Sequence, residues 1–309
     1  MDNTILLWVG FNLFVILMLA IDLGLFHRKA HEVKFREAIT WSAVWIVLAL
    51  VFNAGVWHYF GEVRAVEFLT GYIIEKSLSV DNIFVFVLIF TSFQVPSAYQ
   101  HKVLFWGVLG ALIMRAIFIF AGVSLIAKFH WIIYVFGVFL ILTGIKIARD
   151  KGTKINIENN PLLKFIRKYI PVTAGYVNSK FTVKLNHKLH ATPLLLVLIL
   201  VETTDLIFAV DSIPAILAIT KDPFIIYTSN VFAIMGLRSL YFALAGSLKY
   251  FTYLHYGLAL ILVFVGIKML ISEFYKLNPF VSLGIIGVIL AGSIAASFIW
   301  KAKEKINQT

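Results

Sequence analysis

The chain has 309 residues, of which 61% are hydrophobic and 14% are charged, against about 25% charged residues in an average soluble domain. This excess of apolar residues excludes a single water-soluble globular domain and indicates that lipid surrounds most of the chain. The sequence has no Cys, which excludes disulfides, thiolate metal sites and cysteine nucleophiles together. The net charge is +11, but the Lys and Arg residues gather in loops between apolar stretches, which argues against a nucleic-acid partner.

The predicted fold class is an all-α membrane protein with about nine transmembrane helices. A spanning helix needs roughly 20 apolar residues, and nine such stretches follow one another along the chain. The first stretch follows Asp2 and has no small-residue cleavage site, so we interpret it as a membrane helix and not a signal peptide. The nine predicted spans are Ile5–Phe26, Ala38–Phe60, Phe68–Phe93, His101–Ala127, Trp131–Ala148, Thr192–Ile219, Phe224–Gly246, Phe251–Phe274 and Phe280–Trp300.

The distribution of positive charge predicts the orientation of these spans. One side of the membrane holds the loops at Phe26–Glu37 and Lys146–His190 together with the C-terminal tail, and this side carries 19 Lys and Arg residues, whereas the other carries four. The positive-inside rule then places the N-terminus outside and the C-terminus in the cytoplasm. Asp150–His190 is predicted to be a cytoplasmic linker without sustained periodicity. Its Lys residues suit anionic lipid headgroups, although the orientation signal alone explains them.

Two segments of similar sequence indicate an internal duplication. Ile74–Ile83 aligns with Thr204–Ile213, and an acidic residue matches an acidic residue at both ends of the motif. Two further landmarks, Ala-Gly and Gly-Ile-Lys, recur in the same order in each copy. Each copy holds three helices, which predicts the inverted topology of many secondary transporters. The predicted parts are two N-terminal helices (1–65), repeat one (66–149), the linker (150–190), the inverted repeat two (191–275), and the last helix with its tail (276–309).

Five carboxylates lie inside the predicted spans. An uncompensated charge at a helix centre costs about 2.5–3.5 kcal/mol, so such groups need protons, basic partners or a bound cation. We therefore interpret them as an ion-binding set, with structural polar packing as the alternative. The five are Glu75, Asp81, Glu202, Asp205 and Asp211.

Helical spacing brings further oxygen atoms onto the same faces. Asn82 lies seven positions after Glu75, and Ser212 lies seven positions after Asp205, so each pair shares a face of its helix. Glu202 lies one turn before Asp205 on the second helix. Two such helices facing each other would converge their side-chain oxygens.

The second acid of each motif does not fit this face on a regular helix. Asp81 and Asp211, six positions after the first acid, would point about 120° away at 3.6 residues per turn. Pro214 cannot donate to the carbonyl of Val210, so we expect a helix break that frees this carbonyl as a ligand. The first copy has Phe84 in place of that proline, and a break there is less strongly indicated.

The available ligands are oxygen atoms, because all eight His residues lie in loops or near predicted helix ends. Oxygen-rich sites suit Mn²⁺, Mg²⁺ and Ca²⁺ and not Cu or Zn, and several carboxylates favour a divalent cation over Na⁺. An anionic cage would be overcharged for one ion, so protonation of some acids, and hence proton coupling, is our hypothesis. Arg115 and Arg238 occupy corresponding helices and are candidate counter-ions, either pairing with the acids after the ion has left or acting as static structural partners.

Three segments resemble the TerC family of bacterial integral membrane proteins, and within it the Alx-like branch. They are Glu75–Phe84, Glu202–Ala215 and Ser229–Arg238, and the resemblance extends over nearly the whole chain. It implies Mn²⁺ efflux across the bacterial cytoplasmic membrane. It also implies metal ligands among Glu75, Asp81, Glu202, Asp205 and Asp211, with Asn82 and Ser212 adjacent. The family name refers to tellurite, yet a carboxylate-lined site would repel a tellurium oxyanion.

The predicted function is therefore a divalent cation exporter that uses alternating access. Mn²⁺ is the expected transported ion, Mg²⁺ or Ca²⁺ are less favoured, and no organic cofactor is expected. An enzyme is not indicated, since the chain shows neither a nucleophile with a nearby His nor a soluble active-site domain. Two alternatives stay open: a cation-binding membrane scaffold or sensor that signals through the linker or a partner, and an exporter of small cationic solutes. The expected partners are the metal ion and the lipid bilayer, whereas the sequence identifies no protein partner.

Overall fold

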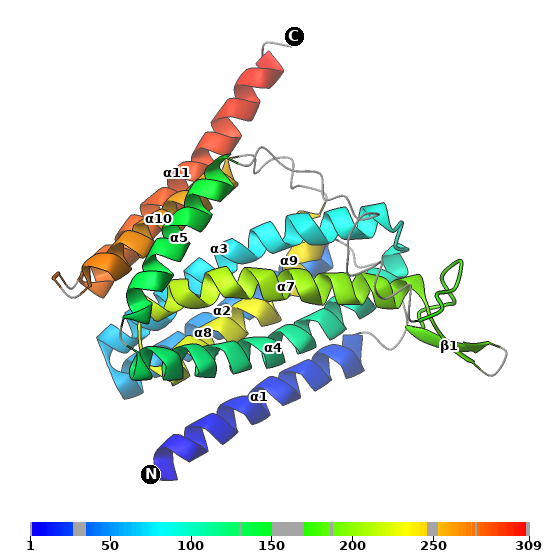
Figure 1. Ribbon diagram of the computed structural model, residues 1–309, viewed down its shortest axis with the longest axis horizontal. Helices are drawn as coiled ribbons and strands as arrows, with labels where there is room; N and C mark the ends of the chain where they lie inside the picture. The colour runs from blue at the N-terminus through cyan, green and yellow to red at the C-terminus, as the bar shows by residue number, and fades with distance from the viewer. Residues whose placement is uncertain are drawn as a thin grey trace.

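The computed structural model describes residues 2–26, 35–129, 131–149, 170–185, 188–245, 253–272, 274–275 and 277–306. Within these ranges some side chains lie outside its description, namely those of residues 2–4, 22–26, 81, 84, 127, 210, 211, 254, 255, 279 and 300–306. The described chain is almost entirely helical (Figure 1). Its helices are α1 (Asp2–Phe26), α2 (Phe35–Phe60), α3 (Glu62–Ser92), α4 (Ser97–Lys128), α5 (Ile132–Arg149), α7 (Pro193–Leu217), α8 (Pro223–Met235), α9 (Leu237–Leu244), α10 (Leu254–Ile271) and α11 (Pro279–Ile306).

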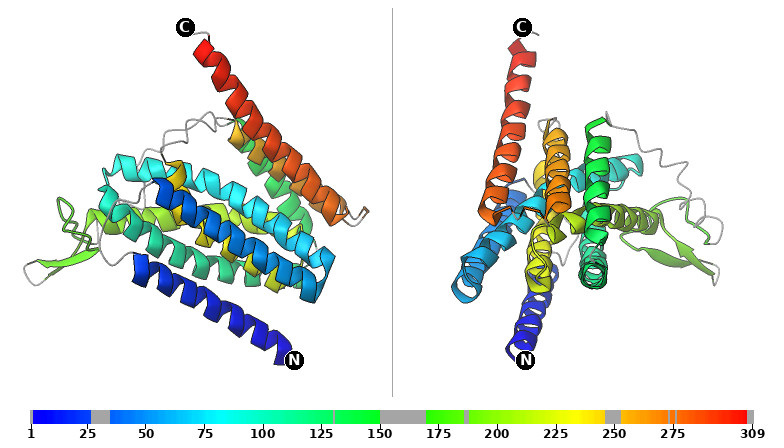
Figure 2. Two further views of the ribbon diagram at one scale, coloured as in Figure 1. Left: turned by 180° about the vertical axis from the view of Figure 1, so that it is seen from behind. Right: turned by 60° about the vertical axis from the view of Figure 1, so that its left-hand side comes forward.

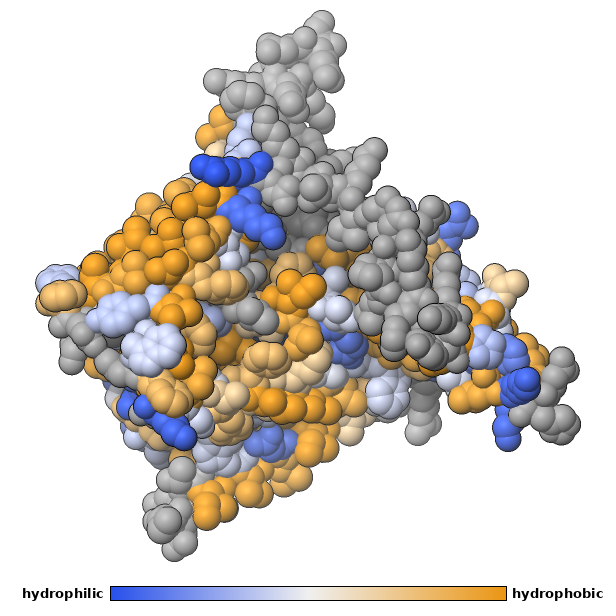
Figure 3. Space-filling model, viewed as in Figure 1, coloured by the Kyte–Doolittle hydropathy of each residue, from blue (hydrophilic) through white to orange (hydrophobic). Residues whose placement is uncertain are grey.

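These helices confirm the predicted all-α membrane fold. By length and composition, α2, α4, α5, α7 and α11 could each cross a bilayer, and α1 and α10 contain shorter apolar segments. Large apolar side chains are exposed along the helices, among them Leu6, Val51, Ile117 and Val288. In the space-filling view, apolar side chains cover much of the helical surface, while hydrophilic side chains gather near helix ends and on the hairpin (Figure 3). Such a surface suits contact with lipid tails.

The seventh predicted span is not one helix but two. α8 begins at Pro223 behind the N-cap residue Asp222, whose carboxylate accepts hydrogen bonds from the amides of Phe224 at 2.9 Å and Ile225 at 3.3 Å. It ends at Met235, and α9 starts after Gly236. The chain is therefore interrupted in the middle of a buried apolar segment.

The helix break that we expected at Pro214 is wrong. α7 runs without interruption from Pro193 to Leu217 with Pro214 inside it. Proline removes one backbone donor, but neighbouring helices can hold such a helix together in a bundle. α3 and α4 both pack against α7, and such support allows the helix to continue through the local defect.

α3 lies at the centre of the bundle. It packs against α2, α7, α8 and α11, and α4 packs on α7 and α8 (Figures 1 and 2). Its 31 residues include Glu75, Lys76 and Asp81, which explains why hydropathy alone does not select it as a span. Burial against four helices is what allows a segment with these charges to lie in the membrane interior.

α5 and α10 form a close pair that is set at an angle to α3, α4 and α7, with α11 beside it (Figures 1 and 2). Glycine makes the close approach possible. A β-carbon on Gly144 would lie 2.7 Å from the carbonyl oxygen of Ala259, and one on Gly266 would lie 2.6 Å from that of Gly137. Small residues at such contacts are typical of helix pairs in membranes.

The predicted linker contains regular structure that its sequence does not signal. Strands β1 (Thr182–Leu185) and β2 (Lys188–Ala191) form an antiparallel hairpin near its C-terminal end. The segment before it docks on the turn between α3 and α4, where the Tyr176 hydroxyl donates to the Phe93 carbonyl at 2.8 Å and Lys102 donates to the Ser179 carbonyl.

Candidate cation site between the two motif helices

The candidate site is built around the buried guanidinium of Arg115. α4 places this side chain between α3 and α7, with only 2% of it exposed. It forms an ion pair with Glu75 of α3 and a second one with Asp205 of α7, at 3.3 Å. One side chain thus joins the first acids of both sequence motifs.

Two neutral oxygen atoms complete the contacts of this guanidinium. Arg115 donates to the Asn230 amide oxygen at 2.9 Å and to the Ser212 hydroxyl at 3.3 Å. The Asn82 amide in turn donates to Asp205 at 3.3 Å. All of these side chains are buried, so this is a connected polar network inside the apolar bundle.

The structure therefore brings together the residues that helical spacing placed on facing helices. Glu75 and Asn82 come from α3, and Asp205 and Ser212 come from α7. The hydroxyl of Ser79, on the same face of α3, donates a hydrogen bond to the backbone carbonyl of Glu75 at 2.7 Å. This hydroxyl therefore donates no hydrogen bond to the network. Asp81 and Asp211 also belong to the predicted set, but their side chains lie outside the described side chains. The carbonyl of Val210, which we expected a helix break to free, belongs to the continuous helix α7.

Several acceptor atoms in this network have no hydrogen-bond donor among the described residues. Glu75 Oε2, Asp205 Oδ2 and Asn82 Oδ1 are all buried and unpartnered in this sense. A buried acceptor without a donor is costly, and carboxylate and amide oxygens are the ligands of hard divalent cations. The oxygen atoms of this network are therefore chemically suited to such a cation.

Glu202 lies beside this network but is held differently. Its carboxylate rests against the backbone of α4 at Gly110, where a β-carbon would overlap the carboxylate oxygens. Glu202 Oε2 is buried without a described hydrogen-bond partner. Only glycine at position 110 leaves room for this arrangement, so Gly110 is a position that decides where Glu202 points.

The two predicted counter-ions occupy different surroundings. Arg115 forms the network described above, whereas Arg238 lies buried at the start of α9, just after the helix interruption, and is not among the groups that Arg115 contacts. Arg115 is carried by the continuous helix α4, whereas the segment that carries Arg238 is interrupted at Gly236.

Sequence reasoning missed three residues that shape this region. Asn230 binds Arg115, Gly110 seats Glu202, and Lys76 donates to the Ala233 carbonyl at 3.2 Å near the end of α8. The sequence does contain a signal for Asn230, because a single amide side chain inside a strongly apolar helix is unusual. The roles of Gly110 and Lys76 depend on which helices become neighbours, and a single sequence does not show that.

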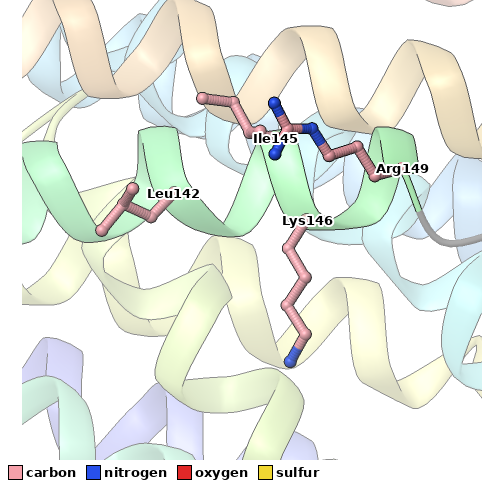
Figure 4. A pocket seen from close by; sticks show the side chains of 4 residues that line it. All are labelled: Leu142, Ile145, Lys146 and Arg149. Carbon is pink, nitrogen blue, oxygen red and sulfur yellow. The ribbon is translucent and has the colours of Figure 1, made fainter.

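The acids do not form an isolated three-carboxylate cluster among the described side chains, where no group of three Asp, Glu or His residues is close enough to hold a metal ion. A cavity of about 460 Å³ lies elsewhere, at the end of α5, and is lined by Leu142, Ile145, Lys146 and Arg149. There the Lys146 and Arg149 side chains point away from each other (Figure 4). The cavity is thus not part of the acid network.

Comparison with known proteins decides the family. The family model "Integral membrane protein TerC family" matches residues 60–305, which is most of the chain and includes the whole acid network. The chain belongs to the TerC family. The resemblance expected from the three motif segments is thereby confirmed, and this TerC-family chain is an integral, multi-pass membrane protein.

Its relatives come from several bacteria. A membrane protein of Myxococcus xanthus, STKORF319, is 57% identical over 95% of this chain and 92% of its own length. A protein of Escherichia coli K12 with the name "Putative membrane-bound redox modulator Alx" is 52% identical over 93% of this chain and 92% of its own length. The protein of the same name from Photorhabdus laumondii is 46% identical over 98% of this chain. These relatives support the Alx-like branch, and no solved structure matches the chain.

Proposed function

We propose that this TerC-family protein exports a divalent cation, most favourably Mn²⁺, by alternating access, and that it is a carrier and not an enzyme. The observation that supports this most is the buried oxygen network, because it joins equivalent acids of both motifs through one arginine in the interior of a membrane bundle. Intramembrane ionisable groups of this kind mark ion pathways in transport proteins.

The oxygen atoms of the network support a hard divalent cation as the cargo. It offers carboxylate, amide and hydroxyl oxygens from Glu75, Asp205, Asn82, Ser212 and Asn230. This chemistry suits Mn²⁺, Mg²⁺ and Ca²⁺ over softer metals. The choice of Mn²⁺ among them rests on the family resemblance, with Mg²⁺ or Ca²⁺ as less favoured cargo, and the proposal requires no organic cofactor.

Alternating access needs two halves related by symmetry, and the helix contacts support such halves. With an offset of 122 residues, Gly144 corresponds to Gly266, and its contact partner Ala259 corresponds to Gly137. The contact of Gly144 with Ala259 is therefore the symmetry mate of the contact of Gly266 with Gly137. Exchange of partners in this way is what a two-fold axis between α5 and α10 produces.

The proposed orientation says which parts of the chain an exported cation would pass, whereas the direction of export itself rests on the family resemblance. Positive charge in the loops favours an outside N-terminus and a cytoplasmic C-terminus in the bacterial cytoplasmic membrane. The hairpin β1–β2 then lies on the cytoplasmic side and the α7–α8 turn on the outer side. Cargo would reach the acid network from the cytoplasm and leave past that outer turn.

A reconstituted transport assay tests this proposal. Purified protein in liposomes should move Mn²⁺ down an imposed gradient, and Glu75→Gln, Asp205→Asn and Asp211→Asn should each reduce the flux by at least about tenfold, since each removes one charged ligand. Glu62→Gln, an exposed residue at the first turn of the same helix α3, is the matched control and should leave the flux unchanged. Wild-type protein without Mn²⁺ flux, or equal flux through the Asp205 variant, would contradict the proposal.

A second candidate function is a cation-binding sensor that signals through the linker, and the docking of residues 170–192 on the helical bundle favours it. This segment contacts the α3–α4 turn through Tyr176 and Lys102, so a change at the motif helix could reach it. Deletion of residues 151–168 separates the two functions, because it spares the docked part. Unchanged Mn²⁺ flux together with loss of the cellular phenotype would favour the sensor, whereas an intact phenotype would favour the carrier.

The name of the E. coli relative suggests a role in redox balance. This chain has no Cys, so its own side chains cannot perform thiol–disulfide exchange. A carrier that sets the concentration of a redox-active metal would act on redox balance indirectly, which is compatible with the proposed export of Mn²⁺.

A further inference from the structure

We propose that Arg115 is a tethered substitute for the transported cation: it fills the oxygen site after the metal ion has left and allows the empty carrier to return. This inference rests on the proposed transport function and assigns one residue a step in its cycle. It concerns net transport, which is distinct from binding of the ion.

The contacts of Arg115 are those expected of a cation in a coordination site. One guanidinium nitrogen reaches Glu75, Asn230 and Ser212, and the other reaches Asp205. The four acceptors are oxygen atoms from four positions on three helices, α3, α7 and α8. A planar fork with several donors can satisfy such a set at once, which a single ammonium point charge cannot.

A metal ion and this arginine cannot use the site together in the arrangement observed. Glu75 Oε1 and Asp205 Oδ1 are already engaged by the guanidinium, and a divalent cation beside it would meet a like charge in a poorly screened interior. The second oxygen of each carboxylate, Glu75 Oε2 and Asp205 Oδ2, remains available, since neither accepts a hydrogen bond from a described residue. A cation arriving there therefore competes with Arg115 for the same two acids.

Charge accounting explains why a substitute is needed. With both described acids ionised, the pair carries two negative charges, which a divalent cation would neutralise. When that cation leaves, the two negative charges would lie together in an apolar interior without a positive partner. The empty carrier would then have to change conformation with this uncompensated charge inside the membrane. Arg115 supplies one positive charge from the protein itself, and a proton on one acid would supply the other.

This role predicts a particular split between two kinds of flux. Net efflux requires the empty carrier to return, whereas exchange of Mn²⁺ for Mn²⁺ uses only the loaded forms. Removal of Arg115 should therefore block net efflux and spare exchange. It should also tighten Mn²⁺ binding, because the acids lose their internal competitor.

The test uses Arg115→Gln in the full-length protein, with Arg36→Gln, an exposed residue at the start of α2, as the matched control. In liposomes we expect net Mn²⁺ flux to fall at least about tenfold, while exchange of radioactive Mn²⁺ at equal concentrations stays within about threefold of the wild type. Equilibrium Mn²⁺ binding in detergent should tighten by about tenfold. The control should match the wild type in all three measurements.

Other outcomes would contradict either the role of Arg115 or the proposed transport function. Equal loss of net flux and exchange by a folded Arg115→Gln protein, or no loss of either, overturns it. If the wild type shows neither kind of flux, it is the transport proposal that fails. If Arg115→Gln does not fold, Arg115→Lys replaces it, because it keeps the positive charge and every oxygen ligand but loses the planar fork that reaches four acceptors. Here too net flux should fall more than exchange, and an equal effect on both would overturn the inference.

Discussion

The pair formed by Arg115 and Glu75 shows how individual residues make this interior polar. Both side chains are almost completely buried, at 2% and 1% exposed, so each would be unstable there without the other. Breaking a buried ion pair by removing one partner costs about 3–5 kcal/mol, although the intact pair adds little net stability. The network is thus better explained by a role in ion handling than by a contribution to stability.

Gly110 allows a prediction at the scale of a single methyl group. In Gly110→Ala the new β-carbon would overlap the Glu202 carboxylate, so this acid must move away from α4. We expect Mn²⁺ flux to fall by about tenfold or more, with the free energy of unfolding changed by roughly 1–3 kcal/mol, the usual range for overpacking. Flux and thermal unfolding in detergent measure the two effects.

The matched control for that change is Gly10→Ala, because no atom lies within 4 Å of a β-carbon there. This variant should keep its flux and its midpoint of unfolding. Equal flux in the Gly110 variant would show that the position of Glu202 is irrelevant to transport.

At the scale of elements, the interruption between α8 and α9 is held by a residue from another helix. The last carbonyls of a helix have no partner within it, and Lys76 of α3 donates to one of them, that of Ala233, at 3.2 Å. A β-carbon on Gly236 would lie 2.5 Å from the Lys76 nitrogen, so glycine leaves the space in which this ammonium lies. A positive charge at a helix C-terminus is favourable as well.

Lys76→Met should therefore lower the free energy of unfolding by about 1–3 kcal/mol, since it leaves a buried carbonyl without a donor. Lys76→Gln keeps a donor and should lose less. Lys221→Met, an exposed lysine in the α7–α8 turn, is the control. Thermal unfolding measured in detergent distinguishes them, and equal stability of all three variants would contradict the proposed contact.

The pair of α5 and α10 gives a second prediction at this scale. In Gly144→Ala, the added carbon would lie 2.7 Å from the Ala259 carbonyl and 2.8 Å from Val263, and backbone cannot yield as a side chain does. We expect a loss of roughly 1–3 kcal/mol in the free energy of unfolding. Gly266→Ala should behave alike, because its added carbon would lie 2.6 Å from the Gly137 carbonyl.

Gly287→Ala in α11, where a β-carbon meets nothing within 4 Å, should be neutral or slightly stabilising, as alanine favours helix over glycine. Thermal unfolding compares the three variants. A stable Gly144 variant would show that the close approach of α5 and α10 is not needed.

For the whole molecule, the proposed orientation can be tested directly because the chain has no Cys. A single cysteine at Lys184, exposed on the hairpin, should react with a membrane-impermeant maleimide only from the cytoplasmic side. A single cysteine at Lys221, exposed in the α7–α8 turn, should react only from the outside. Intact cells and inverted membrane vesicles provide the two measurements, and the reverse pattern would overturn the proposed orientation.

The sequence by itself determined the helical membrane architecture, because burying backbone in lipid leaves helices as the way to satisfy its polar groups, and long apolar stretches are countable. It also indicated which faces of the motif helices carry oxygen atoms, since Glu75 and Asn82, like Asp205 and Ser212, repeat at helical spacing. Periodicity and charge are local properties of the chain, so these inferences needed no knowledge of neighbours.

Only the tertiary structure decided which groups meet. The sequence offered Arg115 and Arg238 as equals, yet only Arg115 joins Glu75 to Asp205. It indicated a break at Pro214, yet α7 stays continuous inside its bundle, and the interruption lies at Gly236, where Lys76 can stabilise the open helix end. The physical reason is the same in each case: partners supplied by other helices determine whether a local defect opens or is compensated, and which buried charge is neutralised.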